Sequence, residues 1–349
     1  MESVSLPIFS EVKAAAQKPK GWPFLRLGFR PFYLGGTLVA ALAVPLWVAL
    51  FMGGIAQSPT VQALLWHAHE MLFGFAVAII VGFLMTAGKN WTGLSTPRGA
   101  SLAALALLWL GARIAALTGP TVLYAALDMV LLPLVAGLLA RLLLRAKNHR
   151  NLPLVLILAL LATANLVFHL ATLGVLDVPA MTPLHAALGL IIMIESVIAG
   201  RVVPAFTMSA VPGLRLQTTS TQERLTLGLT AAGLLMWVFA PPGPWGFVVL
   251  LTAAGLHAKR LWRWRPMLTR HKPILWILHG AYAWIALGLL LLALAQMAWV
   301  PLTAGVHALA VGATGGLIIG MATRTARGHT GRPLVLTRIE VAAYALVMT

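Results

Sequence analysis

Three ionisable side chains, His67, His69 and Glu70, lie at the start of an apolar stretch of the chain. Polar groups inside a bilayer are costly, and they therefore indicate a functional site. A His-x-His pair on an α-helix places its rings about 200° apart, because one turn contains about 3.6 residues. We expect the imidazoles of His67 and His69 to face different neighbours and to serve two sites. Imidazole suits haem iron and copper, so the stretch predicts the ligand-bearing end of a transmembrane helix.

The composition identifies the class of protein. Of the 349 residues, 60% are hydrophobic and only 9% are charged, and the mean hydropathy is +0.91. Soluble domains contain roughly 25% charged residues, so this class is excluded. The chain has no cysteine, which excludes disulfides, thiolate ligands and cysteine catalysis. Metal ligands must therefore be His, Met, Asp or Glu.

Ten apolar runs approach the ~20 residues needed to cross ~30 Å of hydrocarbon, and the seventh is the shortest. They lie at 34–54, 66–87, 100–118, 121–145, 152–174, 182–203, 225–240, 243–262, 274–297 and 300–322. An eleventh run begins near Ile339 and is too short to span. We expect an all-α, polytopic transmembrane helix bundle with eleven apolar runs, of which the last is incomplete. The chain divides into a cytoplasmic segment, 1–33, and one transmembrane domain, 34–349.

The basic residues predict the orientation. If the N-terminus is inside the cell, the inner segments hold all but one of the 25 Lys and Arg residues, and the outer connections hold none. This asymmetry follows the positive-inside rule. It also explains the net charge of +17 without nucleic acid as a partner, since the charge is scattered between apolar runs. Membrane lipid is the expected partner instead.

The exception is Arg113, inside the third run. Asp128 lies in the fourth run at a similar distance from the outer side, and at 1.5 Å per residue both are roughly 10 Å deep. A lone buried charge is costly, so we expect these two residues to pair. A structural ion pair and a role at a cofactor both remain open.

Five histidines on four runs fall within the outer ~10 Å by the same rise per residue. They are His67, His69, His169, His185 and His307. A single intramembrane histidine usually makes a hydrogen-bonded contact between helices, but convergence from four runs favours ligands. The remaining histidines are expected not to bind the cofactors. His279 lies too deep, and the inner-side interface residues are His149, His257, His271 and His329.

A His-Ala dipeptide recurs at His67, His185 and His307, each time near the outer end of a run and followed by a Gly. Four helices separate each occurrence from the next, which suggests three four-helix units. The arrangement resembles the twelve-helix catalytic subunit of haem–copper oxidases, in which metal-binding histidines come from the second, sixth and tenth helices. In that family the His-x-His pair is on the tenth helix, whereas here it is on the second.

Five motifs extend a second resemblance across nearly the whole chain. They are RLGFRPF at 26–32, WHAHEMLFGF at 66–75, NWTG at 90–93, GRVVPAFT at 200–207 and GHTGRPL at 328–334. In combination they resemble the NnrS family of bacterial inner-membrane proteins. The resemblance implies a haem- and copper-containing protein of about twelve spans, connected with denitrification and with protection against nitric oxide. It implies no particular reaction.

With these cofactors, we expect His67, His69 and His307 to bind haem, by their positions on the second and tenth runs. Arg113 is then the candidate partner for a haem propionate, as the only cation in the outer half. Nitric oxide is small, uncharged and lipid-soluble, so it would reach an intramembrane site without a polar channel.

Copper is expected at His185 and His169, with Glu70 or His69 nearby. The alternative function is a proton-coupled transporter whose relay consists of intramembrane ionisable residues. That relay would contain the outer histidines together with Glu70, Arg113, Asp128 and Glu195. A membrane sensor or assembly factor that binds a metal without catalysis is the third hypothesis.

Overall fold

The computed structural model describes residues 21–55, 60–217 and 219–349. These residues form eleven continuous helices and no strand, so the all-α prediction is confirmed for this part of the chain. Two of these helices are divided into an α, a π and an α segment, namely α2–η2–α3 and α11–η5–α12. The bounds in chain order are α1 Phe29–Phe51, α2 Ala63–His69, η2 Glu70–Ala76, α3 Val77–Thr92, α4 Ala100–Thr118, α5 Thr121–Arg145, α6 Leu152–Thr172, α7 Met181–Ala210, α8 Ser220–Phe239, α9 Pro244–Arg263, α10 Pro273–Gln296, α11 Leu302–His307, η5 Ala308–Gly315, α12 Gly316–His329 and α13 Arg338–Met348. Short 3-10 turns are η1 Pro23–Leu25, η3 His149–Asn151 and η4 Pro266–Thr269. Residues 1–20 of the predicted cytoplasmic segment lie outside the described residues.

Within the described residues, eight helices are long and apolar enough to cross a membrane, which makes this a multi-pass membrane protein. All ten predicted runs form helices, but α8 and α9 are not among these eight. The reason is charge at one end of this antiparallel pair. Helix α8 begins with Glu223 and Arg224 in its first turns, and α9 ends with Lys259, Arg260 and Arg263.

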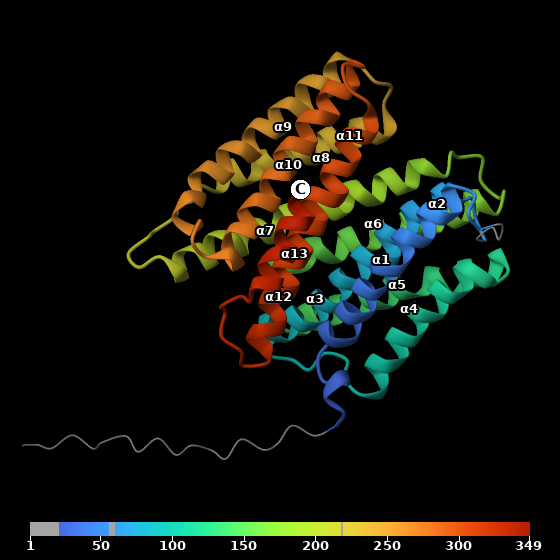
Figure 1. The fold of residues 1–349 in the computed structure, drawn as a ribbon, viewed down its shortest axis with the longest axis horizontal. Helices are drawn as coiled ribbons and strands as arrows, with labels where there is room; N and C mark the ends of the chain where they lie inside the picture. The colour runs from blue at the N-terminus through green and yellow to red at the C-terminus, as the bar shows by residue number, and fades with distance from the viewer. Residues whose placement is uncertain (1–20, 56–59, 218) are drawn as a thin grey trace, which may run out of the picture.

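Consecutive helices pack mainly against each other, as α4 with α5, α5 with α6 and α9 with α10. Figure 1 shows the amino-terminal helices (blue to green) gathered on one side of the molecule and α8 to α11 (yellow to orange) on the other, with the long α7 passing between them. Helix α12 (red) lies beside α3 and α1. Two contacts between distant segments hold the groups together. Helix α7 packs against α10, and α1 packs against α12.

The second membrane helix, which comprises α2, η2 and α3, occupies the centre. Of its most apolar window 72% is buried inside the protein, against 11% for α1. Helix α1 approaches closely at Gly82, where an added Cβ would lie 3.0 Å from the Phe32 side chain. The first N–H of α1, at Phe29, donates to the Thr86 hydroxyl at 3.0 Å, which satisfies a group that a helix start leaves free.

Two spans contain a π-helical segment, and each segment begins directly after a histidine. In the second membrane helix α2 ends at His69 and η2 follows, and in the last one α11 ends at His307 and η5 follows. π-Helical turns are rare and are frequent at functional sites. His185, which precedes Ala186 near the outer end of its run, lies in α7, which is α-helical throughout.

Helix α13 is held by one ion pair and one capping box. Arg327 at the end of α12 donates to Glu340 at 3.0 Å and 2.5 Å. Glu340 also accepts the Thr337 N–H at 2.7 Å, while Thr337 caps the helix through its hydroxyl. The hydrogen bond from Arg327 lowers the pKa of the Glu340 carboxyl to about 2. Because the folded-state pKa is lowered, the carboxylate stabilises the docked helix above the usual pKa of 4.5, and this contribution is lost as the pH falls through 2.

We predict that Glu340→Gln loosens α13 at pH 7, because it removes both the ion pair and the charged half of the capping box. Hydrogen exchange of amides 338–348 should accelerate while exchange in α3 stays unchanged. Asp177→Asn, a change of an exposed carboxylate in a loop, is the matched control. Equal exchange in the native chain and in Glu340→Gln would contradict the assignment.

Candidate functional site

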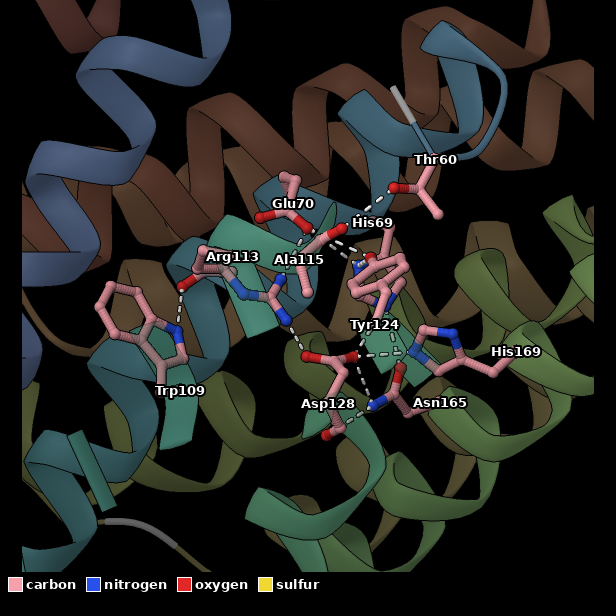
Figure 2. Close-up of polar contacts among 11 residues, drawn as sticks. Thr60, His69, Glu70, Trp109, Arg113, Ala115, Tyr124, Asp128, Asn165 and His169 are labelled. Carbon is pink, nitrogen blue, oxygen red and sulfur yellow. Dashed lines mark hydrogen bonds and ion pairs between the residues drawn. The ribbon is translucent and has the colours of Figure 1, made fainter. Parts of the chain in front are cut away.

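A buried cluster of polar side chains lies where four helices meet (Figure 2). The junction of α2 and η2 contributes His69 and Glu70, α4 contributes Arg113, α5 contributes Tyr124 and Asp128, and α6 contributes Asn165 and His169. All seven side chains are buried, and both imidazoles are 0% exposed. Within the described residues, His69, Asp128 and His169 are the group whose ligand atoms could hold a metal ion.

The Arg113 guanidinium lies between two carboxylates. It donates to Glu70 Oε1 at 2.7 Å through Nη1 and pairs with Asp128 through Nη2. The predicted pairing of Arg113 with Asp128 is therefore confirmed. Glu70 is a second partner that matched depth alone did not reveal. Since both partners engage the guanidinium, Arg113 serves this cluster, and its role at a haem propionate stays a prediction.

The two imidazoles converge on the same carboxylate oxygen. His69 Nε2 and His169 Nε2 lie 3.2 Å and 3.0 Å from Asp128 Oδ2. The ligand atoms of the three residues all lie within 4.8 Å of one another. Nitrogen and oxygen ligands at ~2.0–2.1 Å from a tetrahedral metal are about 3.3 Å apart, so these separations suit either hydrogen bonds or metal coordination.

Outer contacts fix the His69 ring. Its Nδ1 lies 2.6 Å from the Tyr124 hydroxyl, which donates to Glu70 Oε1 at 3.2 Å. The ring stacks on Phe73 and on Phe168, with centroids 4.7 Å and 4.5 Å away. A histidine that binds a metal through one nitrogen usually hydrogen-bonds through the other, and His69 has this arrangement.

The π-helical segment leaves room for the charged groups. At Gly74 an added Cβ would lie 2.7 Å from Glu70 Oε2 and 3.2 Å from Arg113 Nη1, so the position requires glycine. The Trp109 indole N–H donates to the Gly74 carbonyl at 3.0 Å. At the outer end, the Thr60 hydroxyl donates to the Ala115 carbonyl at 3.0 Å, which ties the segment before α2 to α4 (Figure 2).

The cluster has an excess of negative charge. Glu70 and Asp128 are 2% and 7% exposed, and one guanidinium faces both of them. With both imidazoles neutral, one carboxylate charge remains without compensation inside an apolar protein. Isolated buried charge is very costly. A proton on one carboxyl group, a proton on a histidine or a bound metal cation would neutralise it.

Sequence reasoning missed Tyr124 and Asn165 and did not treat Asp128 as a metal ligand. The spacing of these residues in the sequence could have indicated that they belong to the site. Tyr124 and Asp128 are four residues apart, and so are Asn165 and His169. Residues at this spacing lie on one face of a helix. The Asn165 amide accordingly donates to Asp128 Oδ2 at 2.8 Å.

The structure places the other predicted ligands apart from this cluster. His67 faces away from His69 and stacks on Trp47 of α1, with centroids 4.1 Å apart, so the prediction that the His-x-His rings have different neighbours is confirmed. His307 is the last residue of α11 and is exposed. His185 lies against Trp237 of α8, at 4.9 Å.

The expectation that His257 is an ordinary interface residue is wrong. It is 0% exposed, and its nitrogens lie 2.6 Å from the Tyr282 hydroxyl and 2.9 Å from the Thr230 hydroxyl. Nearby, Arg260 pairs with Glu223 of α8. This charged pair explains why a residue near the basic end of α9 is buried: α8, α9 and α10 enclose the polar groups among themselves.

We predict that Arg113→Met destabilises the protein more than Arg113→Met combined with Asp128→Leu. The single change leaves two carboxylates and no cation, a net charge of −2. The double change leaves only the Glu70 carboxylate, a net charge of −1, which equals that of the native cluster with its two carboxylates and one guanidinium. Removing one partner of a buried pair costs ~3–5 kcal/mol. Monodisperse yield and the melting temperature in detergent measure the difference.

Arg141→Met, at an exposed position of α5, is the matched control for loss of a basic side chain. A double variant no more stable than Arg113→Met would show that charge balance does not govern this cluster.

Comparisons with known proteins give one family. The family model described as NnrS protein matches residues 23–349. No curated protein matches the chain, and no solved structure does. The match covers nearly the whole chain, including every residue of the buried cluster. This chain belongs to the NnrS family.

Proposed function

We propose that this chain is a haem- and copper-containing membrane protein that binds or processes nitric oxide, or protects against it, in denitrifying bacteria. Membership of the NnrS family supports the nitric oxide connection. The distribution of Lys and Arg supports a location in the bacterial inner membrane with the N-terminus in the cytoplasm.

The observation that contributes most to the proposal is the buried negative charge beside two histidines. We propose that His69, His169 and Asp128 hold a copper ion there. Imidazole and carboxylate are suitable ligands for Cu(II), and a cation would neutralise the carboxylate that Arg113 leaves unbalanced. His69 would bind through Nε2 and donate its Nδ1–H to Tyr124. His185, against Trp237, stays a predicted ligand only.

We propose haem at His67 and His307, nearer the outer end of the bundle. His67 Nδ1 is buried and has no hydrogen-bond partner, a need that a bond to haem iron would meet. The His307 Nδ1–H donates to the Thr303 carbonyl at 2.8 Å, which leaves Nε2 free. Trp47 fixes the His67 ring by stacking. His69 suits copper better than haem, since its Nε2 already faces Asp128 and Asn165.

In such a protein, reduced haem iron supplies the binding of nitric oxide. The chain itself supplies the ligands, their orientation and the surrounding apolar medium. Nitric oxide is lipid-soluble and enters through the membrane, so no polar channel is needed. Glu70, Tyr124 and His69 form a continuous hydrogen-bonded series along which protons can move to or from the site.

That same series favours a second candidate function, a proton-coupled transporter. The charged residues of the cluster and Glu195 would then form a relay within the membrane. Metal content separates the two hypotheses. A transporter of this kind needs no metal at the cluster, whereas the first proposal requires copper there.

The test is elemental analysis and visible spectroscopy of the purified chain. We predict one copper per chain in the native protein and a loss of copper in His69→Ala, His169→Ala and Asp128→Asn, because each removes one ligand. Haem should be retained in those variants and lost in His307→Ala, and nitric oxide should shift the Soret band of the reduced native protein.

His271→Ala, at an exposed position on the basic side, is the control and should leave both metals in place. Copper that survives in all three ligand variants would contradict the copper assignment. A colourless, metal-free native protein would contradict the whole proposal and favour the transporter.

A further inference from the structure

A cavity of about 80 Å³ lies among α1, α3, α7, α10 and α12, apart from the His69 cluster. Its wall on α3 includes Ile79, ten residues beyond His69 and thus about 15 Å along the helix. One water needs roughly 10–15 Å³ of such volume. The cavity therefore has room for several waters or for one six-membered ring.

The lining is apolar except at two side chains, Tyr33 and Glu195. The Tyr33 hydroxyl and Glu195 Oε2 are buried, and neither has a hydrogen-bond partner. Tyr33 is only 7% exposed. Most buried polar groups in proteins are hydrogen-bonded, and an exception requires an explanation. Two such groups in one cavity indicate an occupant that bonds to both.

These two groups reach the cavity from different walls. Tyr33 is on α1, which packs against α3 and α12, and Glu195 is on α7, which packs against α10 and η5. An occupant that satisfies both therefore needs two polar atoms, one for each group. One oxygen would accept from the Tyr33 hydroxyl, and the other would donate to the Glu195 carboxylate.

The occupant has to be uncharged and lipid-soluble. The cavity extends from buried residues such as Leu278 to partly exposed ones, Phe83, Ile198 and Met321. These exposed residues lie on membrane-spanning helices, so entry is from the bilayer. An acidic headgroup would bring a charge into an apolar lining that contains no Lys or Arg.

We propose that this cavity binds the ring of a lipid-soluble quinol, with Tyr33 and Glu195 as its hydrogen-bonding partners. A quinol has hydroxyl groups at opposite ends of an apolar six-membered ring and an apolar tail. The proposal does not depend on the metal sites, since it rests on a separate part of the bundle.

The experiment is equilibrium binding of decylubiquinol to the purified full chain in detergent, without oxygen. We expect saturable binding at one site per chain. Tyr33→Phe and Glu195→Leu each remove one hydrogen bond and should weaken binding roughly 2- to 10-fold. Ala199→Phe should abolish binding because it fills the cavity, and Ile198→Trp fills it from the partly exposed side if Ala199→Phe does not fold.

Tyr344→Phe, which removes an unpartnered hydroxyl outside the cavity, is the control and should bind as the native chain does. Size-exclusion profiles and melting temperatures establish that the variants are folded. Unchanged binding in Tyr33→Phe and Glu195→Leu, or in the cavity-filling variants, would overturn the proposal. Equal binding of decylbenzene, which lacks both oxygens, would show a cavity for hydrocarbon chains and also overturn it, as would absent binding.

Discussion

The arrangement of the amino-terminal helices depends on one buried guanidinium that faces two carboxylates. Arg113 joins α4 to Glu70 at the start of η2 and to Asp128 on α5. Inside an apolar bundle such charges fix the relative positions of their helices. If one charged group moves away, its partner is left as a buried charge without a counter-charge, which is costly. Asp128 in turn fixes His169 of α6. One set of electrostatic contacts therefore positions four helices and brings two imidazoles to one oxygen atom.

The local backbone makes this arrangement feasible. A π-helical segment begins directly after His69, and a glycine within it admits Glu70 and Arg113 at van der Waals distance. The second π-helical segment, after His307, occurs in the span that contains the other predicted haem ligand. His67 stacks on Trp47 of α1, whereas His69 faces the acidic cluster. The His-x-His pair thus contributes to two environments of different charge and exposure.

The membrane helices and one of the buried ion pairs were predictable from the sequence, because long apolar runs and isolated charges within them are visible in the composition. The ten apolar runs all form helices, and the matched depth of Arg113 and Asp128 predicted their pairing correctly. The role of Glu70 was not predictable, because it depends on a π-helical turn that has no simple sequence signal. The prediction that His257 lies at the inner interface was wrong because it, too, depends on a contact between helices. Its position near basic residues suggested an interface, but Arg260 is neutralised by Glu223 from a neighbouring helix and the group is buried.

The central claim is that His69 and His169 together bind a copper ion beside Asp128. Electron paramagnetic resonance of the copper-loaded chain tests it most directly, with nitrogen-15 incorporated into histidine. The account predicts hyperfine coupling from two imidazole nitrogens, and loss of this coupling when His69 and His169 are both replaced by Ala. A copper signal without nitrogen coupling, or one that persists unchanged in the double variant, would contradict it.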